Sequence, residues 1–429
     1  MLTMRAGSKY LIREINQALV LDIVRSHGAL SRTEIAVQAN LSLPTVSGIT
    51  AQLIEMGLVY EQSTGASTGG RRPVLVAFNP RAGYVVGVKL TETTAITVLT
   101  DLSASVVAHH RAPIVAHQPE AIIASIVHAV DALAGAANGA PILGVGMGMA
   151  SVVDRRREVV RFATYFGWHE LPLAQMLEER LNIPVVVDND VNALAVAEQW
   201  FGAGRGVTDF LVISLGRGIG LGMILNGRLY RGAGGGAGEF GHINVQADGP
   251  LCDCGKHGCL EAYVSDPALA RQASAALGRE VRPAEVYPLA VQGDPQVIAI
   301  YRNAGRILGT AVANLVNVLN PARIIIGGEG AVAGHLILPT FEQALNDTCF
   351  GGLRDDVTIV TEPWGDDGWA RGAASLLLGE LFQPVLHREE KERVTLTGAE
   401  VTTGRQGDRR LGGDEGDRRD WERETGRQR

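Results

Sequence analysis

The chain has 429 residues, of which 46% are hydrophobic and 20% charged, and its length predicts two or three compact units rather than a single core. Its net charge of −7 argues against a surface devoted wholly to nucleic acid, although a small DNA-binding module can sit inside an acidic whole. No apolar run reaches the roughly 18 residues that span a bilayer, and the N-terminal segment lacks the apolar stretch of a signal peptide. We therefore expect a cytoplasmic protein without a membrane partner.

Residues 15–57 predict three short helices, because apolar residues recur there at helical spacing. A capping box formed by Ser31 and Glu34 predicts the start of the second helix. Ser42 is placed to cap the third helix, which Gly57 ends. Two helices joined by a tight turn are typical of a helix-turn-helix. We expect the third helix to face DNA with four hydroxyl side chains: Ser42, Thr45, Ser47 and Thr50.

A hairpin follows these helices. Residues 58–62 and 74–78 have the pattern of strands around a segment rich in Gly, Ser and Thr that contains Arg71 and Arg72. Such a hairpin predicts a wing, and its two arginines are suited to DNA phosphates or a narrow minor groove. The alternative is a three-helix interaction module with a solvated arginine pair. We favour a winged helix-turn-helix because capping box, turn, helix and hairpin occur in one run.

From residue 84 to about 380 the chain alternates between strand and helix patterns. Strands are expected at 84–90, 95–100, 105–111, 210–230 and 323–328, and helices at about 119–137 and 297–319. Two strand-rich halves, divided at 188–190, predict an α/β protein with two lobes and a cleft. The expected domains are a DNA-binding domain with wing and linker at 1–80, a two-lobed domain at 81–387 and a disordered charged tail at 388–429.

A cluster of metal-ligand residue types lies in the second half. His242, Cys252, Cys254 and Cys259 supply one imidazole and three sulfurs, the set that Zn²⁺ takes in closed tetrahedral sites. Four protein ligands leave no open position for hydrolysis, so this zinc would be structural. The alternative is a group of reduced, unliganded thiols beside a buried histidine.

A second group of polar residues comes from separate loops of the same region. Carboxylates and amides that converge in a cleft suit a polyhydroxylated ligand, because each hydroxyl both donates and accepts. The residues concerned are Asn189, Asp190, Glu239, His242 and Glu261. Asp188 is expected to be a solvated loop residue or a helix cap. The Gly-rich segment 214–222 is either a phosphate cradle or a tight turn.

The motifs SLGRGIGLGMILNGRLYRGAGGGAGEFGHI, CDCGKHGCLE and DNDVNA resemble the ROK family of sugar-responsive repressors and sugar kinases, over residues 15 to about 380. The N-terminal region resembles the repressor branch, especially the xylose-operon repressors. The resemblance implies an actin-like, sugar-kinase type (ribonuclease H-like) fold, a structural zinc, a sugar between the lobes and a homodimer or homotetramer. In the family's kinases, the position matching Asp190 is the general base, and those matching Asn189, Glu239, His242 and Glu261 hold the sugar.

The chain departs from the kinase pattern where a nucleotide's phosphates would bind. Lys89, Thr91 and Glu92 stand in place of the family's first phosphate loop, and Arg217 replaces a threonine of the second. Charge neutralisation is most of phosphoryl-transfer catalysis, so these changes predict a protein that is not an enzyme. Tyr165 and the segment Met149-Ala150 also depart from the family pattern, which leaves the identity of the sugar open.

These observations predict a DNA-binding transcriptional regulator, a repressor, of carbohydrate metabolism genes. A monosaccharide in the cleft would adjust its affinity for operator DNA. One alternative is an ATP-dependent sugar kinase that carries a DNA-binding module. The other is a regulator controlled by a protein partner, in which the polar residues of the cleft serve structure only.

Overall fold

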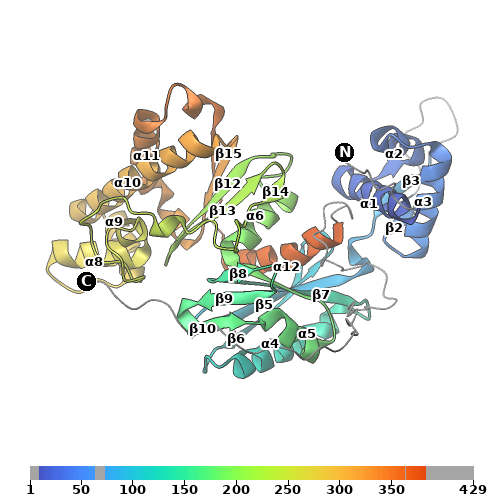
Figure 1. Cartoon of the computed structure of the whole chain (residues 1–429), viewed down its shortest axis with the longest axis horizontal. Helices are drawn as coiled ribbons and strands as arrows, with labels where there is room; N and C mark the ends of the chain where they lie inside the picture. Colours follow the sequence, from blue (N-terminus) through green and yellow to red (C-terminus); the bar gives the residue numbers. More distant parts are fainter. Residues whose placement is uncertain (1–8, 63–72, 363, 383–429) are drawn as a thin grey trace, which may run out of the picture. The chain divides into compact units, whose positions relative to one another are not determined.

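The computed structural model describes residues 9–62, 73–362 and 364–382 (Figure 1). The predicted charged tail and the wing arginines, Arg71 and Arg72, lie outside these residues. The described part contains an N-terminal winged helix followed by an α/β domain with two five-stranded sheets. The predicted fold class is therefore confirmed.

The N-terminal domain consists of helices α1 (Lys9–His27), α2 (Arg32–Ala39) and α3 (Leu43–Glu55) and a small antiparallel sheet. Its strands are β1 (Leu30–Ser31), β2 (Val59–Gln62) and β3 (Leu75–Phe78), in the order β1-β3-β2. Strands β2 and β3 pair antiparallel, as the predicted wing requires.

Local side-chain chemistry sets the ends of these helices. The Ser31 hydroxyl accepts from the Glu34 N–H while the Glu34 carboxylate accepts from the Ser31 N–H, so the predicted capping box is present. Asn40 ends α2 in the left-handed conformation, at φ 53°, which a short polar side chain tolerates. Ser42 then caps α3 by accepting from the Thr45 N–H. The sequence therefore dictates the helix-turn-helix at short range.

The first large sheet has the strand order β11-β7-β4-β5-β6. Its strands are β4 (Tyr84–Leu90), β5 (Thr94–Asp101), β6 (Val106–Pro113), β7 (Ile142–Met149) and β11 (Val185–Asn189). Strands β4 to β6 form an antiparallel meander, whereas β7 and β11 run parallel to β4. Beside it lies a three-stranded sheet of β8 (Val152–Asp154), β9 (Val159–Ala163) and β10 (Trp168–Leu171), and α4 (Pro119–Ala134) and α5 (Leu173–Leu181) complete this lobe.

The second large sheet has the order β14-β13-β12-β15-β16. Its strands are β12 (Phe210–Leu215), β13 (Ile219–Leu225), β14 (Arg228–Leu229), β15 (Arg323–Gly327) and β16 (Thr358–Glu362). The helices of this lobe are α7 (Glu261–Val264), α8 (Asp266–Leu277), α9 (Pro283–Val291), α10 (Pro295–Leu319) and α11 (Gly334–Thr348). Each sheet thus joins a meander to parallel strands, and the predicted two lobes are confirmed.

Two helices connect the lobes. Helix α12 (Asp366–Phe382) packs on β4, β5 and β7, and α6 (Asp190–Phe201) packs on α12, β12 and β13. Figure 1 shows α6 and α12 beside each other between the strands of the two sheets. The approach of α12 needs glycine beneath it, because a Cβ at Gly146 would stand 1.9 Å from the Ala373 carbonyl oxygen.

One stretch of the described chain, Pro119–Ala137, has the length and mean hydropathy, 1.5, of a membrane span. The expectation that no stretch of the chain is long and apolar enough to span a bilayer is therefore wrong. The helix packs against β5 and β6 and buries Ile122, Ile126 and Leu133, as a core helix does.

Candidate functional site

The start of α3 presents the predicted DNA-facing hydroxyls, with one exception. Ser42 and Thr45 are exposed, and Ser47 is partly exposed. Thr50 is fully buried, and its hydroxyl accepts from Arg32 Nε at 3.0 Å and donates to the Ser47 carbonyl. The prediction that Thr50 faces DNA is therefore wrong, because at helical spacing Thr50 shares the buried face of α3 with Val46 and Leu53.

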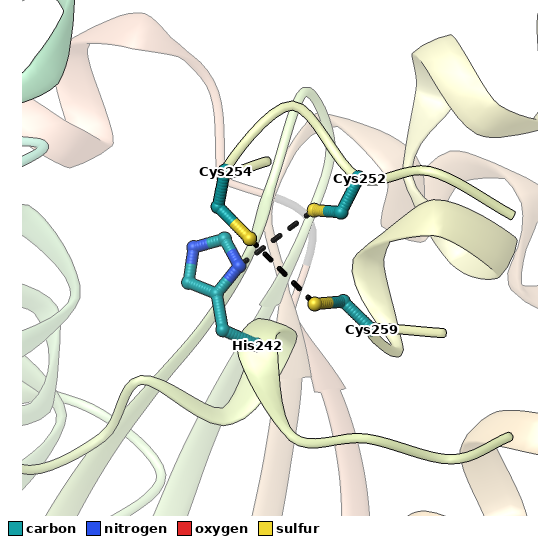
Figure 2. A group of neighbouring side chains, drawn as sticks. All are labelled: His242, Cys252, Cys254 and Cys259. Atoms are coloured by element: carbon teal, nitrogen blue, oxygen red, sulfur yellow. Dashed lines mark hydrogen bonds between the residues drawn. The ribbon is translucent and has the colours of Figure 1, made fainter. Parts of the chain in front are cut away.

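The four predicted metal ligands converge, although they come from a short 3-10 turn and a glycine-rich loop. Their ligand atoms all lie within 4.8 Å of one another. Figure 2 shows His242 Nδ1 facing Cys252 Sγ, at 3.8 Å, and Cys254 Sγ facing Cys259 Sγ, at 3.7 Å. Atoms that bind one zinc ion at about 2.0–2.3 Å stand roughly 3.5–3.8 Å apart at the corners of a tetrahedron. The cluster therefore fits a metal ion of this size.

The backbone around the cluster is shaped by glycine. Gly258 has φ 72°, and a Cβ there would lie 1.7 Å from the Gln246 carbonyl oxygen. This close approach lets the loop return on itself and brings Cys259 toward Cys252. The loop's own histidine, His257, is engaged elsewhere, since its Nδ1 lies 3.0 Å from the Gly249 carbonyl oxygen.

Asp190 is the first residue of α6, and it meets a cation from strand β4 of the first large sheet. Lys89 Nζ lies 2.6 Å from Asp190 Oδ2, and both side chains are about one-eighth exposed, at 12% and 13%. The same ammonium group stands 3.7 Å from the centre of the Trp369 ring on α12. The carboxylate is thus neutralised by a fixed protein cation, while its second oxygen accepts from the nearby Val191 N–H.

Glu239, His242 and Glu261 gather beside the metal-ligand cluster. His242 Nε2 lies 4.0 Å from Glu239 Oε2, on the opposite side of the ring from the cysteines. Glu261 Oε2 accepts from the Ile219 N–H at 3.0 Å. Burial raises the pKa of Glu239, the neighbouring His242 lowers it, and the negative charges of Glu261 and Asp190 raise it further. That coupling places three of the predicted sugar-contacting carboxylates in one electrostatic neighbourhood.

The remaining residues of the DNDVNA turn are more structural than expected. Asn189 caps α6 by accepting from the Val191 and Asn192 N–H groups, and its amide donates to the Ser151 carbonyl. Asp188 is 1% exposed, and it accepts from Arg231 Nε at 2.7 Å and from the Asn192 amide. The expectation of a solvated or capping Asp188 is therefore wrong, because a distant arginine compensates its burial.

The positions of the two kinase phosphate loops are joined by an ion pair. Arg217 Nη1, between β12 and β13, lies 3.0 Å from Glu92 Oε2, between β4 and β5. Arg217 also donates to the Tyr165 hydroxyl and stacks on that ring at 4.5 Å. The segment 214–222 consists of the ends of β12 and β13 and the tight turn that joins them, as one of the two alternatives for this Gly-rich segment expects.

A feature that the sequence reasoning missed is a cavity of about 420 Å³ in the second lobe. It is lined by apolar side chains of α8 and α9 and by polar ones from several segments, among them Asp266, Tyr287, Tyr301 and Glu329. Burial and the neighbouring Glu329 raise the pKa of Asp266. No sequence motif predicts this cavity, because the residues that line it come from segments far apart in the chain.

Comparison with known proteins agrees with this geometry. The model of the ROK family matches residues 85–380, and that of the MarR family matches residues 14–63. A xylose repressor of Caldicellulosiruptor bescii is 31% identical over 392 residues, which cover 88% of this chain and 98% of the relative.

Solved structures give the same result. A ROK family transcriptional regulator, a homologue of the E. coli MLC protein, superposes with a TM-score of 0.76 at 25% identity, covering 85% of this chain and 96% of the other. A ROK family glucokinase from Streptomyces griseus, in complex with glucose and AMPPNP, reaches 0.60 at 34% identity and covers 68% of this chain and 99% of its own. The xylose repressor and the transcriptional regulator cover 88% and 85% of this chain, whereas the glucokinase covers 68%. The chain therefore belongs to the ROK family and is a DNA-binding transcriptional repressor of the branch in which a winged helix precedes the ROK domain.

Proposed function

We propose that this repressor controls genes of carbohydrate metabolism and that a monosaccharide adjusts its operator affinity. The observation that carries the proposal is the group formed by Asp190, Glu239, His242 and Glu261, in a chain that also bears a winged helix. Three carboxylates and an imidazole accept and donate hydrogen bonds as sugar hydroxyls require. Asn189 would contribute to sugar binding through the second N–H of its side-chain amide. It also caps the N-terminus of α6 and so positions Asp190.

The same geometry supports the proposal that the protein is not a kinase. A general base must take a proton from the sugar hydroxyl, whereas Asp190 is held by Lys89 at 2.6 Å. A nucleotide's phosphates need cations and free backbone N–H groups, but Glu92 adds a negative charge where they would lie. Because Glu92 pairs with Arg217, the cation of the second loop is also not available to the phosphates. Asp190 then serves as an acceptor for a sugar hydroxyl rather than as a base.

The metal of the Cys3His cluster is proposed to be a structural Zn²⁺. His242, Cys252, Cys254 and Cys259 would hold it, and the ion would supply folding free energy rather than a reactive water. Binding through Nδ1 would orient the His242 ring so that Nε2 faces Glu239. The metal cluster and the sugar site would therefore be coupled through this one side chain.

The proposed partners follow from the domain composition. A homodimer or homotetramer in the cytoplasm would place two winged helices on operator half-sites about one helical turn, or a multiple of it, apart. Ser42, Thr45 and Ser47 are proposed to contact DNA at the start of α3. Arg71 and Arg72 are proposed to contact the DNA backbone. Each phosphate contact would then add about 0.9 to the steepness with which the logarithm of the binding constant falls against the logarithm of the salt concentration.

The test combines two titrations. Calorimetry with D-xylose, D-glucose and N-acetyl-D-glucosamine identifies a bound sugar, and operator titration with and without it measures the response. Asp190→Asn should still fold and bind operator DNA, with the altered sugar-free affinity that loss of the Lys89 ion pair brings, but its response to sugar should be weaker, because an acceptor of hydroxyl protons becomes partly a donor. Absence of binding at millimolar concentration would refute sugar sensing and favour the regulator that answers to a protein partner.

A further inference from the structure

Helices α6 and α12 lie side by side, and a cation stands between them at one end. At that end the Lys89 ammonium touches both helices: it is 2.6 Å from Asp190 on α6 and 3.7 Å from the Trp369 ring centre on α12. This is also the end at which the proposed sugar would bind. A change in the charge or hydrogen bonding of Asp190 therefore acts on both helices at once.

A second cation stands at the opposite end of the same pair of helices, and it comes from the DNA-binding domain. The Arg25 guanidinium of α1 lies 4.7 Å from the Trp200 ring centre, at the end of α6, and 5.1 Å from the Phe382 ring centre, at the end of α12. It also lies 5.9 Å from the Phe201 ring. Its side chain is only 10% exposed and is paired with Asp22 at 2.6 Å. Cation–π contacts gain strength in such a desolvated position.

Other contacts also hold the DNA-binding domain against the C-terminal ends of α6 and α12. Arg205, in the turn after α6, donates to the Ser26 carbonyl at the end of α1. The Phe78 ring of β3 meets the Phe382 ring edge to face, at 5.9 Å between centres. Buried residues of α1, including Val20 and Val24, share one apolar cluster with Val196 of α6 and Leu381 of α12. Because packed interiors are close to crystal density, displacement of either helix moves its neighbours.

We propose that Arg25 is the positioning residue through which a ligand at Asp190 changes operator affinity, with α6 and α12 as the connection. This inference rests on the sugar sensing proposed above. Helix α6 has 12 residues and is therefore about 18 Å long, with the ligand site at its first residue and the Arg25 contact at its last turn. A sugar hydroxyl that competes with Lys89 for Asp190 shifts the start of α6 against α12. Arg25, held between the far ends of both helices, carries that shift into the winged helix.

The decisive variant is Arg25→Ala, with Arg13→Ala on the exposed face of α1 as its control. Three quantities are measured for each full-length protein: sugar affinity for D-xylose, D-glucose and N-acetyl-D-glucosamine, operator affinity without sugar, and operator affinity at saturating sugar. Arg25→Ala should bind sugar as the parent does and lose the response of operator affinity to below about 2-fold, against the 5- to 150-fold typical of allosteric coupling. Arg13→Ala should retain the full response. A full response in Arg25→Ala would overturn the proposal.

Two further measurements keep the test decisive. If Arg25→Ala fails to fold, Trp200→Leu removes the ring but keeps an apolar side chain, and a full sugar response in that variant would equally refute the role of Arg25. The second measurement needs no sugar, so it separates this inference from sugar sensing itself. Lys89→Met should change operator affinity in the parent but not in the Arg25→Ala background, whereas equal effects in both backgrounds would show that the two ends are independent.

Discussion

Lys89 and Asp190 are 101 residues apart in the chain, yet Nζ and Oδ2 form an ion pair of 2.6 Å between two largely buried side chains. The pair joins β4 to the first turn of α6. Lys89 stands where the resemblance to kinases places the first phosphate loop. Lys89 on β4 thus binds the carboxylate at the start of α6.

Removal of the lysine should destabilise the fold. Lys89→Met leaves a largely buried carboxylate without its cation, which should lower the free energy of unfolding by roughly 3 kcal/mol. The double variant Lys89→Met/Asp190→Asn should recover most of this loss, because the uncompensated charge is gone. Urea denaturation of the three proteins checks this. Equal stability of the parent and Lys89→Met would show that the pair contributes nothing.

Removal of the metal from the Cys3His cluster should lower the stability of the fold. The protein purified without chelators should contain one zinc per chain by elemental analysis, and chelation should lower its melting temperature. Cys254→Ser should lose the metal and show the same lower melting temperature, whereas Cys349→Ser, far from the cluster, should retain both. Protein that contains no stoichiometric metal would contradict the assignment.

The two threonines of α3 should behave differently. Thr45→Ala removes an exposed hydroxyl and should weaken operator binding by about 3- to 10-fold, the value of one ordinary hydrogen bond, with little change in stability. Thr50→Val removes a buried hydroxyl that bonds Arg32 and the Ser47 carbonyl, so it should cost roughly 1–3 kcal/mol of stability. Operator affinity of the folded Thr50 variant should stay near that of the parent. The reverse pattern would place Thr50 in the interface.

Incubation with ATP and common hexoses or pentoses should yield no appreciable phosphorylated sugar. The physical reason is the Lys89–Asp190 pair, together with Glu92 and Arg217 across the phosphate loops. A coupled assay for ADP measures this directly, with a ROK family glucokinase as the positive control. Turnover of about one per second or faster, within the usual enzyme range, would refute the proposal that the protein is not a kinase.

The pH dependence of stability should reveal Glu178, a residue of α5 whose pKa is raised by burial. A carboxyl with a raised pKa in the folded state favours folding while protonated, and this contribution is lost as pH rises through that pKa. Glu178→Gln retains the acceptor for the Val185 N–H and removes the charge. It should be more stable than the parent at pH 7 by more than the roughly 0.5 kcal/mol scatter of surface substitutions, and equal to it below about pH 4.

The control is the exposed neighbour Glu179, because it shares the same helix but not the burial. Glu179→Gln should leave stability within about 0.5 kcal/mol at both pH values. The measurement is the denaturation midpoint of the parent, Glu178→Gln and Glu179→Gln, each at pH 7 and at pH 4. A gain for Glu178→Gln that is the same at both pH values would show that burial of the charge is not its cause.

The sequence alone determined the features that depend on neighbours in the chain. Ser31, Glu34 and Ser42 set the ends of the recognition helices because capping acts over three residues, and the strand pattern of the two meanders follows from alternation. The metal cluster was equally readable, since three of its four ligands lie within eight residues of one another and the glycines between them fit a tight loop.

Only the tertiary structure decided which polar side chains meet a distant partner. Asp188 has the pattern of a loop residue but is buried against Arg231, and Thr50 has the pattern of a DNA contact but packs beneath Arg32. Likewise Arg25 lies near the end of a short helix in the sequence, and only the fold brings Trp200 and Phe382 to it. Periodicity and spacing describe one segment at a time, whereas burial and ion pairing depend on which segments the fold places together.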